Sequence, residues 1–169
     1  MRQDPPATGQ ELEQLTAFLD YQRETVLQKA EGLDAEGLRR PLPPSSLTLG
    51  GLLNHLALVE DSWFRERFAG LPGQEIWAGV DWQADPDFEF RTAADLAPDE
   101  LRQRYRDACA RSREVVARAE GLDQLGAQAW QDGTRWNLRW VLLHMIEETA
   151  RHAGHADLLR EAVDGRVGE

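Results

Sequence analysis

Apolar side chains recur at helical spacings in four long segments of this chain. The first segment runs from residue 9 to residue 31. Its apolar stripe is Leu12, Leu15, Leu19 and Val26, and Leu33 follows just beyond it. Thr8 and Glu11 stand three residues apart, which predicts a capping box at the start of this helix. Prolines at positions 41, 43 and 44 follow, and proline cannot continue a helix because it lacks the N–H group.

The other three segments have clear start and stop signals. The second begins near Ser46 or Thr48 and ends before a Gly-Leu-Pro-Gly turn at residues 70–73. The third begins near Pro98, with two acidic residues in its first turn, where the helix dipole favours them. The fourth follows Asn137, a plausible cap, and runs from residue 138 to about 163, before Asp164 and Gly165.

The connections between these segments are unequal, and two of them are long. Residues 71–96, rich in Asp, Gly and aromatic side chains, join the second and third segments, and residues 121–135 join the third and fourth. Connections of this length are often functional. The alternative is that the rings at Trp77, Trp82, Phe88 and Phe90 seal one end of the core. We predict an all-α fold: one four-helix bundle domain over residues 1–169, with long connections between helices 2 and 3 and between helices 3 and 4.

Composition and charge exclude several classes of protein. The chain has 169 residues, of which 41% are hydrophobic, enough to close a core. Its 30 acidic and 19 basic residues give a formal net charge of −11, which argues against binding to nucleic acid or to an anionic membrane. One cysteine, Cys109, cannot form an internal disulfide or a cysteine-rich zinc site. Without a spanning segment or a signal sequence, we expect a cytoplasmic protein.

Histidine placement is the strongest chemical signal in the sequence. Three of the four histidines, His144, His152 and His155, share the last predicted helix. At about 100° per residue these three and Glu148 fall within a sector of roughly 80°. Apolar residues lie in or beside this sector, and Arg139, Asp157 and Arg160 lie opposite it. The polar cluster is therefore expected to face the bundle, where ionisable groups need a partner or a metal.

Distances along the helix restrict which of these groups could bind one ion. His144 and His152 are roughly 12 Å apart along the axis, too far to share an ion directly. Glu148 and His152, at i and i+4, are roughly 6 Å apart on one face. The pairs His152–His155 and His144–Glu148 are also sterically feasible. Another helix must supply a further ligand, and His55 is the remaining histidine, although it could instead be a core-edge residue bonded to a carbonyl.

Two segments resemble the DinB-like superfamily. The segment SLTLGGLLNHLALVEDSWF, residues 46–64, resembles that superfamily's second-helix motif. The segment LRWVLLHMIEETARHAGHAD, residues 138–157, resembles its last-helix motif. The similarity extends over essentially the whole chain. Within the superfamily, the chain resembles the branch related to mycothiol-dependent maleylpyruvate isomerase and the bacillithiol transferases.

The resemblance implies one divalent metal, zinc or nickel, held in a four-helix bundle. The matching ligands are His55, Glu148 and His152, with a glutamate where many members carry a third histidine. We expect isomerase activity to be the weaker alternative, because the chain ends at residue 169 without the C-terminal extension of those isomerases.

Three functional hypotheses follow from these residues. The first is a metal-dependent thiol S-transferase-like enzyme that uses a low-molecular-weight thiol as cosubstrate against an electrophile, with His155 as the candidate for proton transfer. The second is a stress-related metal-binding or interaction protein that catalyses no reaction. Under both hypotheses the protein could form a homodimer. The third, placed lowest, is a structural bundle whose histidines are satisfied in the core and bind no metal.

Overall fold

The computed structural model describes residues 2–168, and in this range the chain is helical without a β-strand. The four long helices are α1 (Glu11–Ala30), α3 (Leu49–Glu60), α5 (Pro98–Arg118) and α6 (Leu138–Asp164). A π-helical segment, η1 (Asp61–Phe68), continues α3. Shorter helices are α2 (Ala35–Arg39), η2 (Glu75–Trp77), α4 (Phe88–Thr92) and η3 (Ala93–Asp95). The predicted all-α bundle with two long connections is confirmed.

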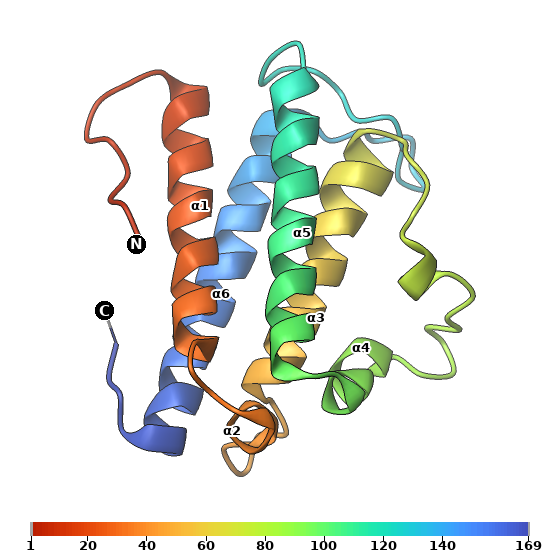
Figure 1. Cartoon of the computed structure of the whole chain (residues 1–169). Helices are drawn as coiled ribbons and strands as arrows, with labels where there is room; N and C mark the ends of the chain where they lie inside the picture. Colours follow the sequence, from red (N-terminus) through yellow and green to blue (C-terminus); the bar gives the residue numbers. More distant parts are fainter. Residues whose placement is uncertain (1, 169) are drawn as a thin grey trace.

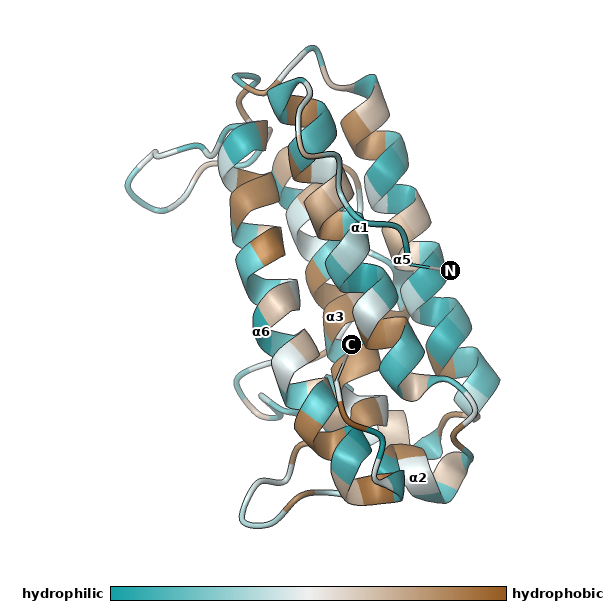
Figure 2. Ribbon diagram, turned by 90° about the vertical axis from the view of Figure 1, so that its left-hand side faces the viewer, coloured by the Kyte–Doolittle hydropathy of each residue, from teal (hydrophilic) through white to brown (hydrophobic). Residues whose placement is uncertain are grey.

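The long helices form two parallel pairs. α1 and α6 run in one direction, and α3 and α5 run in the other (Figure 1). α1 packs mainly on α6, and α3 packs mainly on α5. Hydrophobic residues gather on the inner sides of the helices (Figure 2), and all four long helices contribute side chains to the core. α3 also contacts α6, and we call the line of contact between these two helices the seam.

Local signals account for most helix ends. The Thr48 side chain accepts a hydrogen bond from Gly51 N at 3.0 Å, and the Asn137 side chain accepts one from Trp140 N at 2.9 Å, as expected for N-caps. Gly165 ends α6 with a φ of 78°, a conformation that favours glycine. The predicted capping box of Thr8 and Glu11 is wrong. The cap is Gln10, without a side-chain bond, because the Glu11 carboxylate bonds Arg139 at 2.6 Å instead.

The second predicted helix changes its geometry midway. At Glu60 the α-helix widens into the π-helix η1, a form that frequently marks functional sites. Glu60 is fully buried and accepts two hydrogen bonds from Arg23 of α1, at 2.7 and 2.6 Å. The next residue, Asp61, accepts two from Arg111 of α5, at 2.9 and 2.8 Å. Two neighbouring carboxylates are thereby bonded to different helices at the point where the geometry changes.

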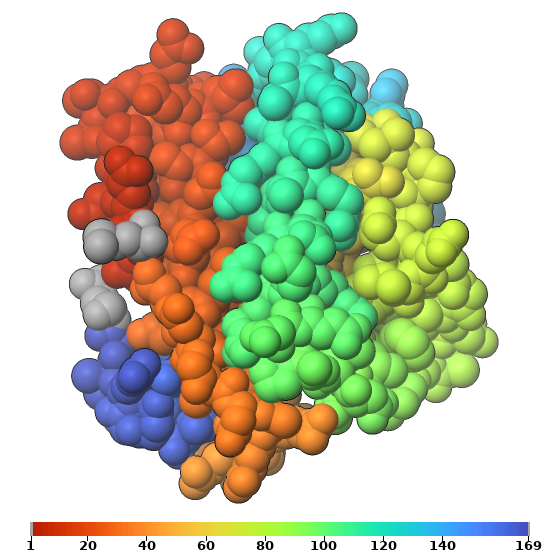
Figure 3. All heavy atoms as spheres, viewed as in Figure 1, coloured from red at the N-terminus to blue at the C-terminus, as the bar shows by residue number. Residues whose placement is uncertain are grey.

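The long connection after η1 packs along the side of α3. Its yellow and green residues form the right-hand side of the molecule in the space-filling view (Figure 3). Trp77 is buried and Phe90 half-buried, as expected if the rings seal the core, but Trp82 is 38% exposed. The connection therefore covers part of the core and also presents an aromatic ring to solvent.

The outer side of α6 is buried at one charged position. Arg160 lies opposite the histidine sector of the helix, and yet it is 2% exposed. Its guanidinium donates to the carbonyls of Lys29 and Glu31, at 2.9 and 2.7 Å, where α1 ends. Helical periodicity gives the direction of a side chain but not the neighbour it meets.

Within residues 2–168, no helix is both long and apolar enough to cross a membrane.

Candidate metal centre

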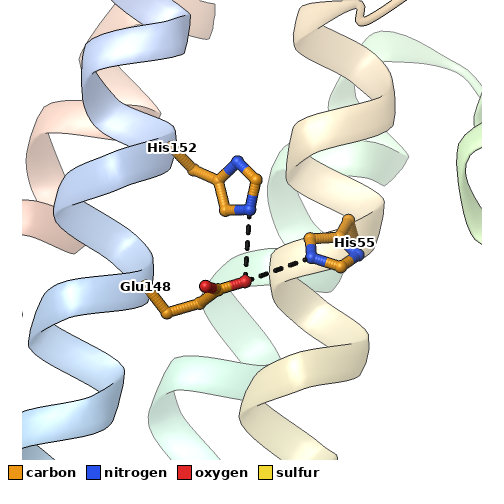
Figure 4. Close-up of side chains that lie close together, drawn as sticks. All are labelled: His55, Glu148 and His152. Atoms are coloured by element: carbon orange, nitrogen blue, oxygen red, sulfur yellow. Dashed lines mark hydrogen bonds and ion pairs between the residues drawn. The ribbon is translucent and has the colours of Figure 1, made fainter.

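Three side chains from two helices converge at the seam between α3 and α6. His55 comes from α3, and Glu148 and His152 stand one turn apart on α6; all three point into the space between the helices (Figure 4). Glu148 Oε1 lies 3.4 Å from His55 Nε2 and 3.2 Å from His152 Nε2. The side chains are 12 to 20% exposed, so the cluster is shielded but reachable from solvent.

This arrangement fits a divalent metal ion. One ligand atom from each residue lies within 4.8 Å of the others. Zinc binds nitrogen and oxygen ligands at about 2.0–2.2 Å, so two ligands at tetrahedral angles stand about 3.4 Å apart. The two distances to Glu148 Oε1 are close to that value. Three protein ligands at a site open to solvent are typical of catalytic zinc centres, which keep a position free for water or substrate.

The other nitrogen of His55 is held by a buried carboxylate. Glu89, on α4, is 5% exposed, and its Oε1 lies 2.9 Å from His55 Nδ1. The ring of Phe90 stacks on His55 with centroids 4.7 Å apart. Asn54, next to His55 on α3, donates to the Glu89 backbone carbonyl at 2.7 Å and so ties α4 to α3. With Nδ1 occupied by Glu89, the Nε2 atom of His55 is directed at Glu148, as in carboxylate–histidine–metal triads.

His155 contacts His152 on the side away from Glu148. The two Nδ1 atoms lie 3.3 Å apart, so one ring donates and the other accepts. Burial, together with the charge of His152, lowers the pKa of His155. A neutral His155 can accept the Nδ1 proton of His152, which leaves His152 Nε2 free to bind metal. The predicted role of His155 in proton transfer stays a prediction.

Without a metal, this cluster is an ion-pair network. Burial opposes the charge of His55, but hydrogen bonds to Glu148 and Glu89 outweigh it and raise the pKa of His55 to about 9. Hydrogen bonds to His152 and His55 lower the pKa of Glu148 well below its ordinary value. A metal ion must therefore displace a proton from His55, and binding is expected to be pH-dependent.

His144, the fourth histidine, is not part of the cluster. Its ring packs between Trp63 and Trp140, with centroids at 4.5 and 5.0 Å. This agrees with the spacing argument, which placed His144 too far from His152 to share an ion. Arg151, which flanks the cluster, forms an exposed ion pair with Glu147 at 2.6 Å.

Sequence reasoning missed Glu89. It lies in the long connection, where no helical periodicity announces α4, and its only unusual feature is that it stands between two phenylalanines. Its Oε2 atom is buried and has no hydrogen-bond partner among the described residues. In metal sites, a ligating histidine commonly donates its other ring N–H to such a carboxylate.

Comparisons with known proteins identify the family. The family model for mycothiol-S-transferase matches residues 14–165. A crystal structure of a conserved protein from Enterococcus faecalis superposes with a TM-score of 0.65 at 17% identity, over 94% of this chain and 100% of that one, which shows a shared fold. A search of curated protein sequences finds no significant match. Because the family model matches most of the chain, the chain belongs to the mycothiol-S-transferase family, a DinB-like family of metal-dependent proteins.

Proposed function

We propose that this protein is a metal-dependent thiol S-transferase, which joins a low-molecular-weight thiol to an electrophile. The observation that carries the proposal is the convergence of His55, Glu148 and His152 on one point at an accessible seam. The family match names the thiol class, and the donor set of two imidazoles and a carboxylate suits zinc or nickel. A bound divalent ion lowers the pKa of a thiol enough to favour the thiolate at neutral pH.

The chain's own cysteine is not the nucleophile. Cys109 is 1% exposed inside the bundle, with its sulfur 3.9 Å from the Glu60 carboxylate. Burial, and then the charge of Glu60, raise the pKa of the Cys109 thiol far above its ordinary value. This thiol therefore stays protonated and out of reach of an electrophile. The reacting sulfur must come from a cosubstrate.

The residues around the centre have separate roles in this proposal. Glu89 holds the ring of His55 so that Nε2 faces Glu148. A neutral imidazole has a single acceptor nitrogen, so His155 takes up the thiol proton only when it is not accepting the Nδ1 proton of His152. With an aryl halide, the sulfur–carbon bond forms as the carbon–halogen bond breaks. The halide leaves as an anion, and the thiol proton is released to solvent, with His155 as the candidate carrier when its bond to His152 is open.

Turnover of a chromogenic aryl halide tests the proposal. The purified protein is assayed with mycothiol, with cysteine and without thiol, before and after removal of metal by a chelator. We expect thiol-dependent turnover that disappears with the metal and returns when zinc or nickel is added. In His152→Ala we expect kcat/KM to fall at least about a hundredfold.

The matched control for this assay is Glu147→Gln, which changes an exposed carboxylate next to Glu148 on the same helix. We expect it to retain wild-type rates. Full activity in His152→Ala would contradict the proposal. Metal uptake without turnover by any thiol would instead favour the non-catalytic metal-binding alternative.

A further inference from the structure

The short helix α4, which carries Glu89, cannot hold its own position. It has five residues and lies in the long connection between η1 and α5. Isolated helices shorter than about 12 residues are marginal in water, because the first turn costs more conformational entropy than its few hydrogen bonds offset. The contact of Glu89 with His55 therefore depends on what holds α4 against the bundle.

Asn54 joins α4 to α3 and α5 through its side chain. It is 0% exposed, and its carboxamide bonds to residues 35 and 50 positions away in the sequence. Nδ2 donates to the backbone carbonyl of Glu89 at 2.7 Å, and Oδ1 accepts from Arg104 Nη1 of α5 at 2.9 Å. A carbonyl only accepts and a guanidinium only donates, so a single orientation of the carboxamide satisfies both partners.

Close packing restrains α4 from the other direction. A Cβ atom on Gly51, which precedes His55 by one turn of α3, would lie 3.0 Å from Phe90 Cδ1. The ring of Phe90 in turn stacks on His55. Packing limits how near α4 can come to α3, and the bond from Asn54 opposes its moving away. Together they set the distance between Glu89 and His55.

Arg104 holds the far end of the Asn54 carboxamide. Its side chain is 18% exposed, and its Nη2 donates to Glu100, one turn earlier on α5, at 3.2 Å. The guanidinium carbon also lies 5.7 Å from the centroid of the Trp77 ring, in the same long connection as α4. Contacts on several sides thus fix the donor that Asn54 Oδ1 meets.

We propose that Asn54 and Arg104 are positioning residues for the metal centre. They act through the backbone of Glu89, whose carboxylate holds the ring of His55. Loss of a direct partner of a ligating histidine typically weakens metal binding by about ten- to a hundredfold. Asn54 and Arg104 act one step further away, so we expect effects of about tenfold or less. The inference rests on the metal centre of the proposed function and adds the contacts that orient one of its ligands.

Zinc affinity, measured by competition with a chromophoric chelator, tests this proposal. Asn54→Leu keeps the approximate size of the side chain and loses both hydrogen bonds, and we expect zinc to bind about tenfold more weakly. Asn54→Asp still accepts from Arg104 but cannot donate to the Glu89 carbonyl, so a similar loss is expected. Arg104→Met, at a partly exposed position, should weaken binding about threefold.

Two further readouts separate positioning from a general loss of stability. Cobalt(II) accepts the same types of ligand as zinc, and its visible absorption depends on how the ligands are arranged, so Asn54→Leu should change that spectrum. A double-mutant cycle with Glu89→Ala is the second readout. If Asn54 acts through the Glu89 carboxylate, Asn54→Leu should lower the zinc affinity hardly further once Glu89 is alanine. Fully additive losses would overturn the proposal.

The matched control is Arg102→Met. Arg102 also lies on α5, is 12% exposed, and pairs with a carboxylate in the first turn, that of Asp99. It donates to the carbonyls of Ala30 and Leu33, at 3.0 and 3.2 Å, where α1 ends. Its removal also breaks hydrogen bonds between α5 and a distant segment but leaves α4 untouched, so the zinc affinity should stay at the wild-type value.

The outcomes distinguish this proposal from the proposed function. Wild-type zinc affinity in both Asn54→Leu and Arg104→Met would overturn the positioning role alone, and so would an equal loss in Arg102→Met. A wild type that binds no zinc would overturn the metal centre and this proposal together. The expected pattern of zinc affinities without turnover of any thiol would contradict the proposed function and leave the positioning residues standing.

Discussion

At the scale of single residues, the contact between His55 and Glu89 orients one side chain of the candidate metal centre. Their atoms Nδ1 and Oε1 lie 2.9 Å apart, and Glu89 is almost fully buried. A carboxylate in this position fixes the tautomer and orientation of a ligating histidine and makes it a better donor. Glu89 is therefore a positioning residue, and the metal affinity should depend on it although it does not touch the ion.

We expect Glu89→Gln to weaken metal binding by about ten- to a hundredfold while the protein stays folded. The measurement is a competition titration of zinc against a chromophoric chelator, with circular dichroism to confirm the helix content. Glu147→Gln, a change of the same kind at an exposed carboxylate, should bind zinc like the wild type. Unchanged affinity in Glu89→Gln would show that Glu89 only packs against His55.

The protonation of His55 predicts how the stability of the metal-free protein depends on pH. The pKa of His55 is about 9 in the folded state, whereas an unfolded histidine titrates near 6.5. This stabilisation is therefore complete below about pH 6.5 and is lost as the pH rises to about 9. We expect the free energy of unfolding to fall by roughly 2 to 3 kcal/mol across this window.

Urea unfolding of chelator-treated protein at several pH values measures this change. His55→Ala is the control, because without the imidazole this contribution disappears and the dependence between pH 6.5 and 9 should flatten. An equally steep decline in both proteins would show that other groups control the stability in this range.

At the scale of elements, a buried ion pair fixes the junction of α3 and η1. Arg23 of α1 is 3% exposed and binds both carboxylate oxygens of Glu60, which is completely buried. The pair holds α1 against the residue at which the helix widens. Trp63, three residues after Glu60, packs its ring on His144 of α6, so the segment held by this pair also contacts the last helix.

Removal of one partner should be strongly destabilising. In Arg23→Leu the Glu60 carboxylate is left buried without its cation, and we expect the free energy of unfolding to fall by about 3–5 kcal/mol. Asp20→Asn is the comparison, because Asp20 also binds Arg23, at 2.8 Å, but its side chain is 39% exposed. That change should cost about 1 kcal/mol or less. A similar small loss in both variants, measured by urea unfolding, would contradict this account of the junction.

At the scale of the whole molecule, the four long helices could be predicted because each one carries apolar periodicity, and all but α1 begin at the start signal that the sequence offers. Thr48 and Asn137 cap the helices that carry the candidate ligands, and Gly165 ends the last one. Axial spacing narrowed the α6 ligands to a few pairs, among them Glu148 and His152. His55 is the one histidine outside that helix, which makes it the candidate for their partner, and the family resemblance favours a ligand there over a core-edge residue bonded to a carbonyl.

The features that escaped prediction all depend on contacts between distant segments. The π-helix begins where Glu60 and Asp61 form ion pairs with two other helices, and no local sequence pattern predicts these pairs. Glu89 reaches His55 from a five-residue helix too short to show periodicity. Arg160 is buried because α1 ends beside it, so its carbonyl partners lie far away in the sequence. The local sequence therefore predicts the helices, whereas the contacts that surround the site depend on tertiary packing.

The central claim is that His55, Glu148 and His152 together hold one divalent metal ion. Elemental analysis of purified protein, after titration with zinc or nickel and removal of free metal, tests it most directly when the wild type is compared with His55→Ala/His152→Ala. We predict about one metal equivalent per chain in the wild type and almost none in the double variant, with equal helix content by circular dichroism. Equal metal content in the two proteins, or none in the wild type after titration, would contradict the claim.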